Sequence, residues 1–196
     1  MRKLWICGIC AALLCCTGCG ETSSQTDSEP AEKNSAGDMT VEAADGFDET
    51  YQTLIADYFQ AIENEDLEAY KAAMYPPYLE AFEKYVTENG SSLEERFQEV
   101  CHRFDEDGYE SWKLTKLELS YYPEDKVDLD DFFDAYASAG IFDADFIANC
   151  KEDTSEIKDV QFSLYALYEG DEEPVQVIGG SEMMVMKNAD GAYLFG

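Results

Sequence analysis

The sequence predicts an α+β fold in which N-terminal helices pack on one face of a curved, mainly antiparallel sheet. Apolar residues recur about every 3.6 positions between residues 48 and 104, which is the period of an amphipathic helix. After residue 108 the period changes to two, which is the period of a half-buried strand. Helices followed by strands, with links between the last strands that suit hairpins, are typical of the α+β class.

The first helix is expected to begin after Asp48, whose side chain can accept hydrogen bonds from backbone N–H groups of the first turn. Apolar residues at helical spacing then make one stripe: Tyr51, Leu54, Ile55, Tyr58, Phe59 and Ile62. A turn at residues 64–66 leads into a short helix over residues 67–75, with Leu67, Tyr70 and Met74 facing inward.

Two further helices follow. Pro76 and Pro77 end the short helix, because proline lacks the N–H that a helix interior needs, and Pro77 can open a helix over residues 77–88. Asn89 and Gly90 terminate that helix. The quartet "SLEE" at residues 92–95 matches a capping box. The apolar residues after it keep the helical period: Leu93, Phe97, Val100, Cys101 and Phe104. His102 lies next to this stripe rather than on it.

The first strand is expected in "SWKLTKLELSYY", residues 111–122. Trp112 and Leu114 occupy one parity, whereas Leu117, Leu119 and Tyr121 occupy the other. A β-bulge at residues 115–116 would reconcile the two parities and curve the sheet. The chain ends in three more strands, over residues 156–169, 173–187 and 191–195, and the links "GDEE" and "NAD" suit hairpins.

Another helix is expected between the first strand and the last three, over residues 129–140, with Asp128 as its cap and Gly140 past its end. It would bury four side chains: Leu129, Phe132, Phe133 and Tyr136. The pattern over residues 141–156 is weaker, and one helical turn is expected there around Phe146.

The first 18 residues have the composition of a secretory signal peptide, since Arg2 and Lys3 precede an apolar run over residues 4–16. A helix of that length rises about 20 Å, whereas the hydrocarbon core of a bilayer is about 30 Å thick, so a permanent span is disfavoured. The run ends in "CTGC", which resembles the lipobox of bacterial lipoproteins, although the position that is usually aliphatic there is Cys16. In that family the last cysteine is thioether-linked to diacylglycerol after the leader is removed. The resemblance implies lipidation at Cys19 and attachment to the extracytoplasmic face of the cell membrane. An ordinary secretory cleavage near residues 18–20 is the alternative.

The chain is therefore divided into three parts: a signal peptide over residues 1–18, a lipidated cysteine with a disordered acidic tether over residues 19–46, and a single α+β domain over residues 47–196. The tether is expected because residues 20–46 are rich in Ser, Thr, Glu, Asp, Gly and Ala, a composition that buries little apolar surface. The remainder has the length of one domain.

The strongly acidic composition disfavours some classes of partner. The chain has 43 Asp and Glu residues against 13 Lys and Arg residues, and its formal net charge of −30 becomes two units more negative when Arg2 and Lys3 are removed. Such a charge repels phosphate, so nucleic acid and anionic head groups are not expected as partners of the domain surface. The acids are expected to keep a tethered protein soluble, with cation or cationic-ligand binding as the alternative.

No catalytic residue, metal site or cofactor is predicted. Removal of the leader leaves Cys101 and Cys150 in the domain, where two buried thiols are expected and a single disulfide is the alternative. His102 neighbours Cys101, but adjacent residues on a helix diverge by about 100° and do not make a nucleophile–base pair. The acidic stretch at residues 104–110 would place Arg103 and Leu114 at the first and last ligand positions of a calcium loop, where acids are needed.

Two stretches resemble the nuclear transport factor 2-like (cystatin-like) superfamily. "YFQAIENEDLEAY", residues 58–70, is similar to its aromatic first helix, acidic turn and second helix. "MVMKNADGAYLFG", residues 184–196, is similar to the closing hairpin of its secreted bacterial members. The resemblance implies a cone-like architecture with an apolar pocket between helices and sheet. Some members are enzymes, including ketosteroid isomerase, and many others only bind or assemble, so the fold alone does not select a function.

The residues favour binding over chemistry. Tyr58 occupies the place of an oxyanion-hole tyrosine of the isomerase, but no Asp stands at the corresponding base position, so Tyr58 is expected in the core. The 13 tyrosines and 11 phenylalanines could line a pocket for a flat or cationic ligand. The expected function is a non-enzymatic, lipid-anchored domain that binds a small ligand or another envelope protein. The alternatives are an isomerase- or hydratase-type enzyme that uses the cone pocket, and an assembly domain that forms a homodimer through its sheet.

Overall fold

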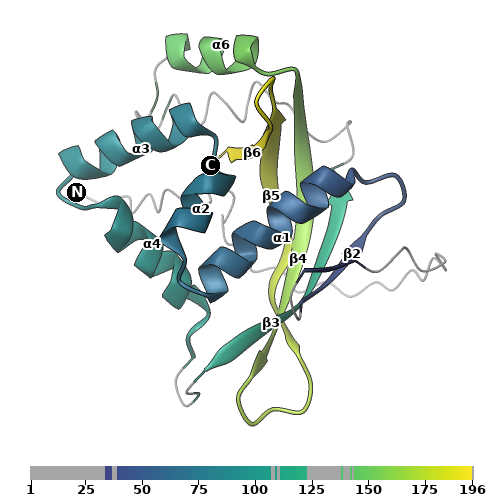
Figure 1. The fold of residues 1–196 in the computed structure, drawn as a ribbon. Helices are drawn as coiled ribbons and strands as arrows, with labels where there is room; N and C mark the ends of the chain where they lie inside the picture. The colour runs from purple at the N-terminus through teal and green to yellow at the C-terminus, as the bar shows by residue number, and fades with distance from the viewer. Residues whose placement is uncertain are drawn as a thin grey trace.

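The computed structural model describes residues 34–36, 39–106, 109, 111–122, 138, 142 and 144–195, and it confirms the α+β class. The helices pack on one side of a curved sheet (Figure 1). The predicted signal peptide over residues 1–18, Cys19 and nearly all of the predicted helix over residues 129–140 lie outside the described residues.

The first helix, α1 (Glu49–Glu63), forms as predicted. The Asp48 side chain accepts a hydrogen bond from the Thr50 backbone N–H, with an N···O distance of 2.7 Å, and so satisfies one donor of the first turn. The predicted stripe is buried apart from Leu54, which is partly buried. It packs on strand β4 (Glu156–Tyr168), where the ring centroids of Phe59 and Phe162 are 5.2 Å apart.

The next helices also follow the predictions. They are α2 (Leu67–Ala73), α3 (Pro76–Glu88) and α4 (Leu93–Cys101), and α4 continues into the 3₁₀ turn η1 (His102–Phe104). Helix α3 begins one residue earlier than predicted, because Tyr75, in extended backbone conformation, is its N-cap. Gly90 has a φ of +80°, which residues with a Cβ disfavour, so the chain turns there. The capping box is confirmed, since Ser92 and Glu95 each accept a hydrogen bond from the other's backbone N–H.

Within the described part of the chain, the sheet has six strands in sequence order. The strands besides β4 are β1 (Asn34–Ala36), β2 (Met39–Ala43), β3 (Trp112–Tyr121), β5 (Val175–Lys187) and β6 (Ala192–Phe195). Neighbouring strands are antiparallel except β2 and β3, which are parallel. The predicted bulge is confirmed, because the pairing of β3 with β4 shifts between Leu114 and Lys116. The β4–β5 pairing contains two further shifts, and such bulges account for curvature of the sheet.

The predicted boundary between tether and domain at residues 46 and 47 is wrong. Strand β2 belongs to the sheet, and its Met39 and Val41 side chains are each only 2% exposed. Val41 pairs with Leu117 of β3, far along the sequence. The stretch "MTVEA" alternates apolar and polar residues as a strand should. It is too short to stand out in the composition of residues 20–46, which was the basis of the tether prediction.

Residues 141–156 contain a longer helix than the single turn expected. Helix α6 (Ala144–Asp153) includes Phe146, whose ring stacks on that of Phe142 with centroids 4.5 Å apart. Ile147 and Cys150, three positions apart, are both buried. The Tyr75 hydroxyl donates to Asp153 at 2.8 Å and fixes the last turn beside the start of α3. This helix was underestimated because its apolar face has few residues.

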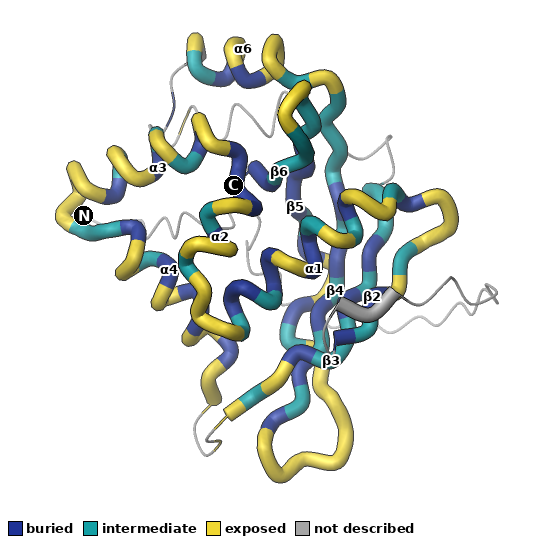
Figure 2. Tube along the Cα trace, in the orientation of Figure 1, coloured by how far each residue is buried: buried dark blue, intermediate teal, exposed yellow. Residues whose placement is uncertain are grey.

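Aromatic rings fill the core between helices and sheet. Tyr70 of α2 meets Phe97 of α4 with ring centroids 4.8 Å apart, and Tyr78 of α3 meets Phe195 of β6 at 4.9 Å. Figure 2 shows buried stretches along the helices and the sheet, whereas the link between β4 and β5 is exposed at its tip. The core therefore packs the helices α2, α3 and α4 together with the last strand, β6.

The inclusion of β2 in the domain can be tested with Val41→Ala. Loss of two buried methyl groups should lower the free energy of unfolding by about 2 kcal/mol, measured by urea denaturation. The control is Thr40→Ala, the half-buried neighbour on the other face of the strand, which should change stability by less than about 0.5 kcal/mol. Equal effects of the two substitutions would contradict the placement.

Candidate functional site

The candidate site is a hollow of about 360 Å³ beside the β4–β5 hairpin. One wall comes from the end of η1 and the residues after it, and the other comes from the end of β4 and the start of β5. Three aromatic residues line it: Phe104, Tyr109 and Tyr168. The volume lies at the lower end of the range of small-molecule pockets.

Hydrogen bonds and ring contacts hold the two walls together. The Tyr168 hydroxyl donates to the Phe104 carbonyl at 2.8 Å, in a buried position. Trp112, which pairs with Tyr168 across the sheet, donates from Nε1 to Asp105 at 2.8 Å. Its ring packs edge-on against Phe104, with centroids 5.4 Å apart. The segment after α4 is therefore fixed to the end of the β3–β4 pair.

A bulge forms the wall on β5. Leu164 pairs with Ile178 and Tyr165 pairs with Gln176, so Val177 is the extra residue on β5. Val177 lines the hollow. Bulges change the direction of side chains and are frequent beside binding sites.

The hollow contains exposed apolar side chains. Among the described residues, two large hydrophobic side chains are exposed, Tyr109 at 39% and Val175 at 45%, and both line the hollow. The rings of Tyr109 and Tyr168 lie against each other with centroids 4.8 Å apart. Apolar side chains that gather in a concave site are a mark of ligand or protein binding.

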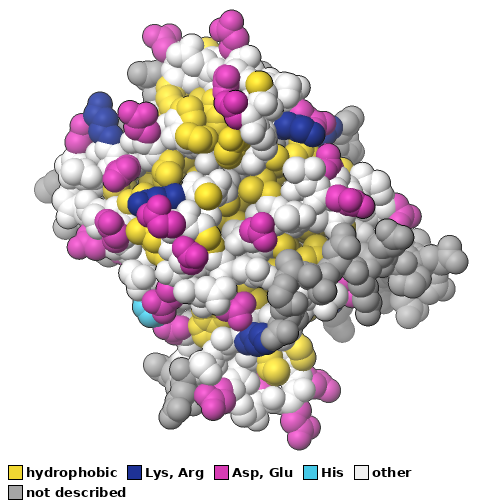
Figure 3. Space-filling model, in the orientation of Figure 1, with side chains coloured by type: hydrophobic (Ala, Val, Ile, Leu, Met, Phe, Trp, Pro, Cys, Tyr) yellow, Lys and Arg dark blue, Asp and Glu magenta, His cyan; other side chains and the backbone are white. Residues whose placement is uncertain are grey.

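Charged residues surround this apolar surface. Arg103, Glu106 and Asp171 line the hollow. A hydrogen bond to Asp171, at 3.5 Å, and the charge of that carboxylate raise the pKa of Tyr109. Figure 3 shows that acidic side chains outnumber basic ones on the face of the molecule that it presents. The hollow thus offers aromatic, aliphatic, cationic and anionic contacts together.

Tyr58 and His102, which the sequence analysis considered for chemistry, do not line the hollow. Tyr58 is 2% exposed, and its ring meets those of Tyr70 and Phe59 with centroids 5.4 and 5.2 Å apart. The predicted core position of Tyr58 is confirmed. His102 is exposed next to the α4 stripe, as predicted, and its Nδ1 lies 2.8 Å from an Asp105 carboxylate oxygen.

Both domain cysteines are free and buried, which confirms the expected thiols and excludes the alternative disulfide in this structure. Burial raises the pKa of Cys101 and that of Cys150 to about 11. A thiol with such a pKa is almost entirely protonated at neutral pH and is a poor nucleophile. These side chains serve as small apolar groups in the core.

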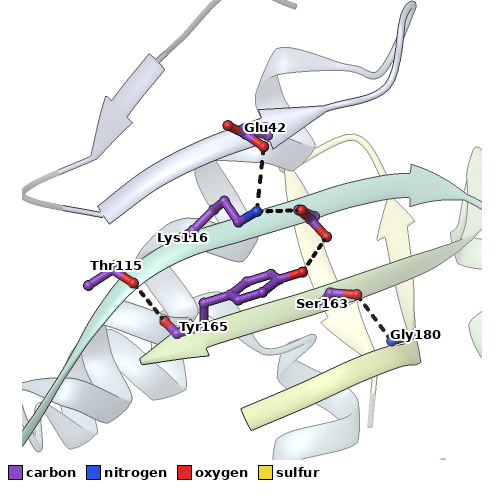
Figure 4. A network of polar contacts seen from close by, with 7 residues as sticks. Glu42, Thr115, Lys116, Ser163, Tyr165 and Gly180 are labelled. Atoms are coloured by element: carbon purple, nitrogen blue, oxygen red, sulfur yellow. Dashed lines mark hydrogen bonds and ion pairs between the residues drawn. The ribbon is translucent and has the colours of Figure 1, made fainter. Parts of the chain in front are cut away.

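The other face of the sheet carries a polar network (Figure 4). Lys116 Nζ lies 2.6 Å from one Glu118 oxygen and 3.8 Å from Glu42 on β2, and the Tyr165 hydroxyl donates to Glu118 at 3.1 Å. These contacts cross from β2 through β3 to β4, so they brace the parallel pair. A homodimer through this face stays a prediction.

One carboxyl group on the same sheet has an oxygen without a hydrogen bond to the described residues. Asp159 Oδ1 is buried without a hydrogen bond within the described structure. Burial, and then the nearby charge of Glu182, raise the pKa of Asp159 to about 6. The alternation of β4 predicts an outward side chain at this position, so the sequence contains no signal that one of its oxygens is buried.

The sequence does not predict the hollow. Tyr109 precedes β3 and Val175 begins β5, and only the fold brings them together. A partial signal is visible in "EEPVQV", where valines directly follow an acidic link, a place in which exposed apolar residues are unusual.

Comparisons with family models, with curated proteins and with solved structures give no match. In the part of the chain that is described, no group of three or more His, Cys, Asp or Glu side chains is placed to hold a metal ion. None of the described helices has the length and apolar character needed to cross a bilayer.

The environment of Asp159 predicts a pH-dependent stability. Its pKa in the folded protein is above the value of 3.8 for an unperturbed group, so this carboxyl stabilises the fold most at low pH, and the effect is lost as pH rises through about 6. Asp159→Asn should therefore raise the free energy of unfolding by about 1 to 2 kcal/mol near pH 8 and change it little near pH 4, measured by urea denaturation. The exposed Asp145→Asn should have little effect at either pH. A gain from Asp159→Asn that is the same at both pH values would contradict this account.

Proposed function

We propose that this chain is a lipid-anchored extracytoplasmic protein whose domain binds a small ligand, or a side chain of another envelope protein, in the hollow without performing chemistry on it. The observation that carries the proposal is that the two large apolar side chains exposed among the described residues, Tyr109 and Val175, line one hollow. Covering apolar surface favours binding by about 25 cal/mol per Å². A ligand that contacts both side chains would therefore gain affinity there.

Anchoring is supported by the first 19 residues. Arg2 and Lys3, the apolar run, Gly18 and Cys19 stand in the order found in bacterial lipoprotein leaders. The acidic domain complements this arrangement, because its charge disfavours adhesion to anionic head groups. The membrane would then be reached through the lipid on Cys19 rather than through the domain surface.

We further propose membership of the nuclear transport factor 2-like superfamily. The run of helices α1 to α4 ahead of β3, the closing β5–β6 hairpin and the bulges that curve the sheet support this proposal. The fold alone still does not select among enzymes, binding domains and assembly domains.

A non-enzymatic role is supported by the burial of the residues most suited to chemistry. The thiols of Cys101 and Cys150 are buried and protonated at neutral pH. Tyr58 packs within an aromatic cluster. The hollow instead presents side chains that recognise shape, charge and apolar surface.

The anchoring proposal predicts that the full chain, expressed in a bacterium with labelled palmitate, becomes labelled and that Cys19→Ala abolishes the label. The matched control is Cys16→Ala, three residues earlier, which should retain it. Equal labelling of the Cys19→Ala variant and the unsubstituted chain would contradict lipidation at this residue.

The binding proposal predicts that a panel of small amphipathic compounds contains at least one that raises the melting temperature. A ligand at ten times its Kd stabilises the fold by about 1.4 kcal/mol, which corresponds to about 3 to 5 °C for a domain of this size. Tyr109→Ser and Val175→Ser should each reduce the shift, whereas Tyr85→Ser on α3 should retain it. A panel without any shift would contradict the proposal.

A further inference from the structure

The hollow contains a cation, Arg103, whose side chain none of the described acidic residues pairs with. Arg103 lines it beside Glu106 and Asp171. Within the described part of the chain the Arg103 side chain makes no hydrogen bond or ion pair, in a protein with 43 acidic residues. A guanidinium recognises a carboxylate through two parallel hydrogen bonds. Arg103 is therefore available to an anionic group of a ligand.

The acids of the hollow keep acceptor capacity. The Tyr109 hydroxyl reaches Asp171 at 3.5 Å, which is long compared with the usual 2.7 to 2.8 Å of an O–H···O bond. The Glu106 carbonyl accepts a hydrogen bond from the Tyr109 N–H at 3.2 Å, but its side chain has no hydrogen-bond or ion-pair partner among the described residues. Both carboxylates can thus accept charge-assisted hydrogen bonds from an ammonium group.

The apolar walls accept a side chain rather than a polar group. The Tyr168 hydroxyl is already bound to the Phe104 carbonyl, so the Tyr168 ring is its contribution to the wall. The Tyr109 ring lies against it, and Val175 exposes aliphatic surface to the same space. An aromatic or branched aliphatic group would cover these surfaces.

We propose that the hollow binds a zwitterionic α-amino acid with an apolar side chain. Its carboxylate contacts Arg103, its ammonium group contacts Glu106 and Asp171, and its side chain packs against Tyr109 and Val175. This inference rests on the proposed function and names the ligand of that site. A purely cationic ligand would leave Arg103 unpaired beside a like charge, and a purely anionic ligand would face two carboxylates. The volume of about 360 Å³ suits a molecule of this size.

The test compares three compounds that share a phenylethyl group by calorimetry on the full chain in lipid nanodiscs. L-Phenylalanine has both charges, phenethylamine has only the ammonium, and 3-phenylpropionate has only the carboxylate. We expect L-phenylalanine to bind at least about tenfold more tightly than either analogue, because a hydrogen-bonded charge contributes that much or more.

Two variants identify the groups responsible. Arg103→Gln should lower the affinity for L-phenylalanine by about tenfold or more, to that for phenethylamine. Glu106→Gln combined with Asp171→Asn should lower the affinity for L-phenylalanine to that for 3-phenylpropionate. The matched control is Arg96→Gln, which removes an exposed ion pair with Glu99 on α4 and should leave all three affinities unchanged. The melting temperature of each variant without ligand reports whether it is folded.

The outcomes separate this inference from the proposed function. If phenethylamine binds as tightly as L-phenylalanine, the inference of a zwitterionic ligand is overturned and the hollow is a site for cations. If none of the three compounds binds while another amphipathic compound stabilises the protein through Tyr109, the inference falls and the proposed function stands. If no compound of the panel binds, both fall.

Discussion

The packing of α1 against the curved sheet is the contact on which the rest of the structure depends. Its apolar stripe meets β4 at Phe59 and Phe162, and the helix also contacts β2, β3, β6, α2 and α4. One helix can reach so many elements because the sheet bends around it, and the sheet bends where bulges interrupt the pairing of β3, β4 and β5. Burial of each large apolar side chain contributes about 1.5 to 3 kcal/mol, so the stripe stabilises helices and sheet as one unit.

Tyrosine hydroxyls help to connect this core to an acidic surface. The pairs are Tyr51 with Glu156 and Tyr75 with Asp153. The hydrogen bond from Tyr51 is the main cause that lowers the pKa of Glu156, while burial and the same bond raise the pKa of Tyr51. In a chain with 43 acidic and 13 basic residues, cations are too few to pair with every carboxylate. A tyrosine donates a hydrogen bond to a carboxylate and buries its ring in the core, so one side chain serves both needs.

The hollow lies at one end of the sheet, between the β4–β5 hairpin and the segment that follows α4. Tyr168 closes the wall through its bond to Phe104, and the bulge at Val177 shapes the opposite wall. Both walls are tied to paired strands, so a ligand would enter a preorganised site and lose less affinity to the ordering of side chains. Glu106 and Asp171 in its lining are of the residue type that dominates this chain, which has 43 acidic residues. Arg103 is one of only 13 basic residues. Among the described residues the Arg103 side chain has no partner, so it stays available to the ligand that we propose.

The sequence by itself determined the features that depend on near neighbours. The α1 stripe, the capping box of Ser92 and Glu95, the turn at Gly90 and the phase slip around Thr115 follow from local periodicity and backbone chemistry, and each stands in the structure. The tertiary structure alone decided the features that depend on distant partners. Strand β2 joins the sheet because Val41 meets Leu117, the hollow exists because Tyr109 meets Tyr168, and the fold buries one carboxylate oxygen of Asp159. The period of a sequence shows which face of an element is apolar, but it carries no information on which remote segment covers that face.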